Sequence, residues 1–110
     1  MAGRVHTFRA IRPSYHEACQ WRDFALMARG CALGECHDWA RLKALALQAR
    51  GLSVFGQAGD GNVCRLLIDA AVEACEAGHP DLVALYRCAD AVMAVHTTWS
   101  MVHQAERRRG

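Results

Sequence analysis

The fold follows first from residues 14–30, which read SYHEACQWRDFALMARG. Ser14 followed by Glu17 three residues later is the capping-box pattern that opens a helix, and Gly30 after an Ala-rich run is a typical stop. Apolar and small residues recur between these signals at helical spacing, which gives the helix one apolar face. The stretch therefore predicts a first helix at about 15–29.

The same start and stop signals recur along the rest of the chain. Asp38 and Gly51 bracket one apolar run, and Asn62 and Gly78 bracket another. Pro80 stands where a last run begins, because proline suits the first turn of a helix. The pattern predicts three further helices, at about 39–50, at about 63–77, and from 80 to near the end of the chain.

Composition agrees with this helical pattern. The chain has 110 residues, of which 53% are hydrophobic and 22% charged, enough to build one modest core. Only two prolines interrupt it. Residues 4–12 are basic and roughly alternate before Pro13, which favours an extended arm. We expect an all-α protein: a short extended N-terminal arm at 1–13, and one compact four-helix domain at 14–110 with a long C-terminal helix.

The last helix carries the strongest indication of function. Unbroken, it would have about 28 residues and span roughly 42 Å, about twice the length of the others, so part of its apolar stripe should stay uncovered. The alternative is a kink or fraying at Thr97 and Thr98, because β-branched residues are weak helix formers. Aromatic side chains are favoured interface anchors, which puts Trp99 first and Tyr86 second. The predicted partner-binding residues are Tyr86, Met93, His96, Trp99, Val102 and His103.

Charge is distributed unevenly along the chain. Residues 1–50 hold eight basic and four acidic residues, whereas residues 51–106 hold two basic and seven acidic ones. This split favours self-association or a charged protein partner. Arg107, Arg108 and Arg109 form a basic end that suits phosphate contacts, so non-specific nucleic-acid binding is a further alternative.

Six cysteines are too few for a disulfide scaffold, and most should be small buried residues in a reducing compartment. Cys31, Cys36 and His37 form the sharpest local cluster, because two thiols and an imidazole are zinc ligands. Cys36 beside His37 also suggests a reactive thiol, although Glu35 and Asp38 disfavour a thiolate there. A metal-binding or thiol-redox module is therefore an alternative function.

None of the common catalytic signatures is present, so we expect a protein that is not an enzyme and needs no cofactor. No apolar run is long enough for a membrane span, and residues 1–13 lack the apolar core of a secretion signal. The expected function is a small cytoplasmic regulator, adaptor or inhibitor that binds another protein or itself, most simply as a homodimer through its last helix.

Overall fold

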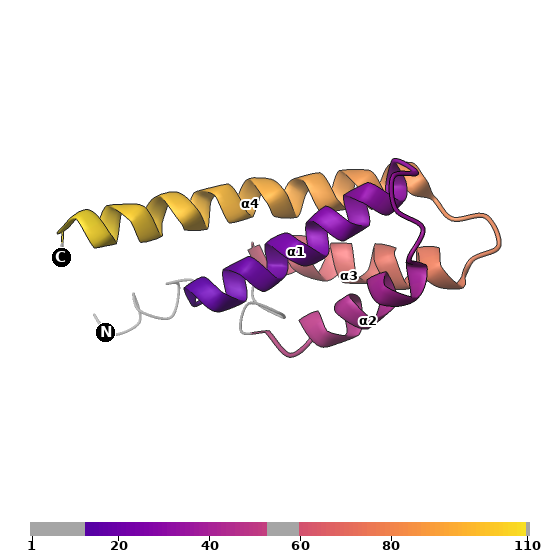
Figure 1. Ribbon diagram of the computed structural model, residues 1–110, viewed down its shortest axis with the longest axis horizontal. Coiled ribbons are helices and arrows are strands. Elements are labelled where there is room, and N and C mark those ends of the chain that lie inside the picture. Colours follow the sequence, from indigo (N-terminus) through magenta and orange to yellow (C-terminus); the bar gives the residue numbers. More distant parts are fainter. Residues whose placement is uncertain (1–12, 53–59, 110) are drawn as a thin grey trace, which may run out of the picture.

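The computed structural model describes residues 13–52 and 60–109, and in these residues the chain forms four helices and no strand. The predicted all-α fold with a long last helix is confirmed. The expected arm at residues 1–13 lies outside the described residues, apart from Pro13. The helices, labelled in Figure 1, are α1 (Tyr15–Ala32), α2 (Trp39–Ala49), α3 (Asp60–Glu76) and α4 (Leu82–Arg109).

The predicted capping box opens α1. The Ser14 hydroxyl accepts a hydrogen bond from the backbone N–H of Glu17 at 3.1 Å, and the Glu17 carboxylate accepts one from the backbone N–H of Ser14 at 3.4 Å. Two donors that a helix start leaves unsatisfied are therefore paired. The first helix begins where the sequence predicts.

The end of α1 lies beyond the predicted stop at Gly30. The helix continues to Ala32, and Gly34 takes the left-handed conformation with φ +78°. The N–H of Glu35 donates to the Gly30 carbonyl at 2.9 Å, and the N–H of Gly34 donates to the Cys31 carbonyl at 3.2 Å. These two bonds form a Schellman motif, in which glycine is needed at the residue after the cap. Gly34, not Gly30, therefore stops the helix.

Carboxylates cap two later helices. Asp38 accepts from the N–H of Arg41 at 3.0 Å and opens α2 as predicted. For α4 the prediction from Pro80 is two residues early, because Asp81 accepts from the N–H of Ala84 at 3.0 Å and supplies the cap that proline lacks. The start predicted at Asn62 for α3 is also wrong, since this helix already begins at Asp60.

The long α4 runs antiparallel to α1 and beside it, as Figure 1 shows. The helix α3 packs against both α4 and α2, and α2 packs against α1. Buried alanines on all four helices let the backbones approach closely around a few large side chains. The large side chains that are fully buried include Trp21, Phe24, Leu42, Leu67, Ile68, Leu85 and Val92.

Trp99 also belongs to this core. Its side chain is only 2% exposed, and its indole N–H donates to the Asp60 carboxylate at 3.1 Å. The bond ties the middle of α4 to the first turn of α3, where the helix dipole favours a negative charge. The expectation that the apolar stripe around Trp99 stays uncovered is therefore not met, because α1 and α3 cover that face of α4.

The last helix is continuous through Thr97 and Thr98. Each threonine hydroxyl donates to a carbonyl one turn earlier, Thr97 to Met93 at 3.1 Å and Thr98 to Ala94 at 3.4 Å. Both threonines thus satisfy their hydroxyls within the helix, and the alternative of a break at this point is excluded.

Replacing Trp99 with alanine tests its place in the core. We expect Trp99→Ala to lower the free energy of unfolding by roughly 3–5 kcal/mol, because it leaves a cavity and deprives Asp60 of its donor. Met101 lies two residues further on the same helix and is 64% exposed, so Met101→Ala should change stability by less than about 0.5 kcal/mol. Urea unfolding followed by circular dichroism measures both, and equal stability of the two variants would contradict the burial.

Candidate functional site

The six residues predicted to bind a partner do not share one exposed face of α4. Trp99 lies in the core, while Met93 is half-buried and packs against it. Val102 is also half-buried. The remaining three separate into two groups at opposite ends of the α1–α4 pair. Tyr86 lies at one end, and His96 and His103 line a pocket at the other.

The first group forms an apolar groove where α1 ends beside the start of α4. Leu33 is 52% exposed and Val83 is 62% exposed, although both are large hydrophobic side chains. They enclose a hollow of about 350 Å³ together with Leu82 and Tyr86. We call this feature the end groove; its lining is Ala32, Leu33, Leu82, Val83, Tyr86 and Arg87.

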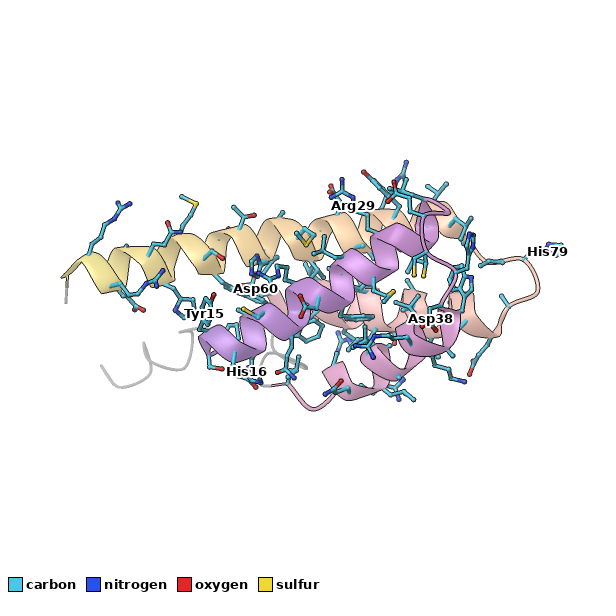
Figure 2. The ribbon with its side chains drawn as sticks, viewed as in Figure 1. Tyr15, His16, Arg29, Asp38, Asp60 and His79 are labelled. Atoms are coloured by element: carbon cyan, nitrogen blue, oxygen red, sulfur yellow. The ribbon has the colours of Figure 1, made fainter. Side chains whose placement is uncertain are left out.

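Two arginines give the end groove a basic edge. The Arg29 guanidinium lies over the Tyr86 ring, 5.7 Å from its centroid, which is a cation–π arrangement. Figure 2 labels Arg29 near the end of α1, beside α4. Arg87 is exposed and lines the groove one turn after Val83. The apolar lining of the groove, with the Tyr86 ring in it, therefore has positive charge beside it.

The second group lies in a pocket between the start of α1 and the second half of α4, which we call the basic pocket. Its volume is about 160 Å³. Figure 2 places Tyr15 at the start of α1, and its ring meets the His103 ring edge-on with centroids 6.5 Å apart. The described residues that line the pocket are Tyr15, Cys19, Arg22, His96, Ser100, His103, Gln104 and Arg107.

The sequence alone does not predict that the lining residues of the basic pocket come together. His96 and His103 were predicted to contact a partner, and Arg107 to contact nucleic acid. The α1 residues Tyr15 and Arg22 were missed, although their seven-residue spacing places them on one face of the helix. Only the antiparallel pairing with α4 shows what that face meets.

The basic end of α4 is only partly described. Arg107 and Arg108 are exposed on the last turns and line a shallow hollow with Gln104. Arg107 also reaches the basic pocket. The predicted nucleic-acid contacts therefore share a residue with that pocket.

The predicted zinc cluster is only half assembled. Cys31 is buried near the Cys36 thiol, but His37 is exposed. In residues 13–52 and 60–109 no three His, Cys, Asp or Glu side chains are placed to hold a metal ion together. The Cys36 thiol instead donates to the Met27 sulfur at 3.3 Å. The turn after α1 is thus stabilised by sulfur contacts.

Burial suppresses the reactivity of the core thiols. Burial raises the pKa of Cys31 to about 12, and the neighbouring Cys36 contributes to the rise. The pKa of Cys64 is also raised to about 12, by burial and then by the charge of Asp60. Since the thiolate is the nucleophile, these positions are poor candidates for thiol chemistry.

Comparison with protein-family models, with curated proteins and with solved structures finds no match to this chain. In the described part of the chain, each helix is too short or too polar to cross a lipid bilayer.

Thiol alkylation tests the inert state of Cys31 and Cys64. At pH 8 we expect iodoacetamide to modify both at least about a hundredfold more slowly in the native protein than in urea, because a pKa near 12 leaves little thiolate. Mass spectrometry of the digested protein follows each position separately. Native rates close to the urea rates would mean that the turn after α1 is an open thiol site.

Proposed function

We propose that this chain is a small non-catalytic protein that binds another protein through the end groove. The observation that carries the proposal is the joint exposure of Leu33 and Val83 around the half-buried Tyr86. Exposed apolar clusters with an aromatic floor are favoured for protein contacts, because they gain free energy when a partner removes them from water. The proposal places the protein in the cytoplasm, where thiols stay reduced.

The charges around the groove indicate which partner fits. Arg29 and Arg87 stand beside its apolar floor. A partner segment that presents an apolar side chain flanked by Asp or Glu would fill the hollow and pair with both arginines. Asp81 lies at the same end, but its carboxylate already caps α4. It therefore competes less with a partner's carboxylate for the two arginines.

A second copy of the chain fits this surface less well. Self-association through the last helix relied on Trp99 as its anchor, and Trp99 is buried. A two-fold dimer through the end groove would bring Arg29 and Arg87 close to the same residues of the other copy. Such like-charge contacts are unfavourable. We therefore propose that the partner is a different protein, whose binding segment has Asp or Glu beside an apolar residue.

The test removes the apolar surface without harming the fold. Val83 is the second residue of α4, where a negative charge is favourable to the helix, and a carboxylate introduced there would stand one turn before Arg87. We expect Val83→Glu to weaken binding of a fitting segment by roughly tenfold or more, because burial of one large apolar side chain is lost. The matched control is Leu66→Glu on α3, since Leu66 is 58% exposed and lies outside the groove.

Segments for this measurement come from a random-peptide library selected on the full chain. We expect enrichment of peptides that join an apolar residue to Asp or Glu, and their affinities are then measured by fluorescence anisotropy for wild type and both variants. Peptides without acidic residues, or equal losses in both variants, would refute the proposal. A concentration-dependent dimer that Val83→Glu abolishes in sedimentation would assign the groove to a second copy instead.

A further inference from the structure

We infer that the basic pocket between α1 and α4 binds a phosphate group, with Arg22 and Arg107 as its charged ligands and the two histidines as additional donors. This site is separate from the end groove. Arg87 of the groove and Arg107 of the pocket are twenty residues apart on one helix, or roughly 30 Å at 1.5 Å per residue. The inference therefore goes beyond the proposed function and stands or falls without it.

The lining of the pocket has the donors that a phosphate needs. Arginine binds phosphate through two parallel N–H donors, and each of the two helices supplies one arginine. Nε and Nη2 of Arg22 donate to the exposed Asp23 carboxylate at 3.3 Å and 3.2 Å, so a phosphate would replace that carboxylate or use the remaining Nη1. Tyr15, Ser100 and Gln104 also line the pocket, and each carries a neutral side-chain donor. Tyr15 is also the first residue of α1, so the positive end of the helix dipole lies at this side of the pocket.

Carboxylates stand beside the pocket, not within its described lining. Asp23 pairs with Arg22 at 3.2 Å, and Glu106 lies 4.0 Å from Nδ1 of His103. These two acids balance the charges of Arg22 and Arg107, whereas protonation of His96 would make the site cationic. The charged or titratable groups that face the pocket or lie next to it are Tyr15, Cys19, Arg22 and Asp23 from α1, Asp60 from α3, and His96, His103, Glu106, Arg107 and Arg108 from α4.

The surroundings of both histidines leave room for a further acceptor in the pocket. Nε2 of His103 is buried and has no hydrogen-bond partner among the described residues. Burial lowers the pKa of His96, and the charge of Arg22 lowers it further, with partial relief from Asp23. A bound anion would accept a hydrogen bond from Nε2 of His103 when that nitrogen carries a proton, and it would offset the charge of Arg22.

The size of the pocket limits the ligand. About 160 Å³ is well below the roughly 300–1,000 Å³ of sites that enclose a whole drug-sized molecule. The pocket therefore fits one oxyanion, either free phosphate or the terminal phosphate of a larger molecule whose remainder stays outside. Donors that converge from two helices suit the tetrahedral oxygens of phosphate better than the flat pair of a carboxylate.

Inorganic phosphate is the first probe, added to the full chain at constant ionic strength and followed by NMR of the histidine rings. We expect saturable shifts of the ring signals of His96 and His103. We also expect phosphate to raise the pKa of His96, because an anion favours the imidazolium. Without phosphate, the lowered pKa of His96 means that the folded state loses stability as the pH falls below about 6.5, and His96→Gln should reduce that loss.

Matched arginine variants locate the binding. Arg22→Gln should weaken phosphate binding by roughly tenfold or more, because it removes a charge-assisted pair of hydrogen bonds. Arg22→Lys, which keeps the charge but not the paired donors, should restore part of the affinity. Arg50 is exposed at the end of α2 and lines neither the end groove nor the basic pocket, so Arg50→Gln removes the same charge elsewhere and should leave phosphate binding within about twofold. Urea unfolding of each variant separates lost binding from lost folding.

An oligonucleotide separates the possible sources of the phosphate. A 5′-phosphorylated single strand that binds more tightly than its 5′-hydroxyl form, and loses that advantage in Arg22→Gln, would support a terminal phosphate. Equal binding of both forms, with a steep salt dependence and no effect of Arg22→Gln, would overturn the pocket and assign the basic end to backbone contacts. Absence of any saturable histidine shift would likewise overturn it.

Discussion

The contact between α3 and α4 at Asp60 and Trp99 fixes the position of the rest of the long helix. Trp99 brings a large apolar ring into the core, and its indole N–H reaches a carboxylate in the first turn of α3. A buried donor without an acceptor would be costly, so the bond selects one register of α4 along α3. Since α1 packs on the same α4, this register also decides which residues of α1 and α4 meet at each end.

Both surface features follow from the antiparallel pairing of α1 and α4. The end of α1 meets the start of α4, where Leu33 and Val83 enclose the end groove. The start of α1 meets the later turns of α4, where Tyr15 contacts His103. Each feature combines residues that are far apart in the chain. Most of the length of α4 separates the two features.

Most helices were predictable from signals that act locally. The capping box at Ser14 and the cap at Asp38 need only residues three positions away, and both are present in the structure. The stop predicted at Gly30 is wrong, because the first glycine after an apolar run need not end the helix. The Schellman motif places its left-handed residue further on, at Gly34. The start predicted at Pro80 is early for a similar reason, since the side chain that accepts from a free N–H of the first turn is that of Asp81.

The candidate sites were less predictable, because they depend on which helix covers which face. Periodicity identified the apolar stripe of α4 correctly, but whether Trp99 is an anchor or a core residue depends on the tertiary position of α1 and α3. No sequence pattern marks Tyr15 and Arg22 as site residues. They become part of a pocket only because α4 lies beside that face of α1.

The uneven charge of the chain has a similar explanation. The basic first half and acidic second half of the sequence favoured self-association or a charged protein partner. In the structure the two halves already meet, as Lys43 of α2 and Glu76 of α3 form an ion pair at 3.1 Å. Exposed pairs of this kind contribute little stability, yet they reduce the charge left for a partner. The charge of a whole half of the chain is therefore a poor guide to a binding surface. Local composition is a better one, such as apolar residues beside Arg29 or hydrogen-bond donors around Arg22.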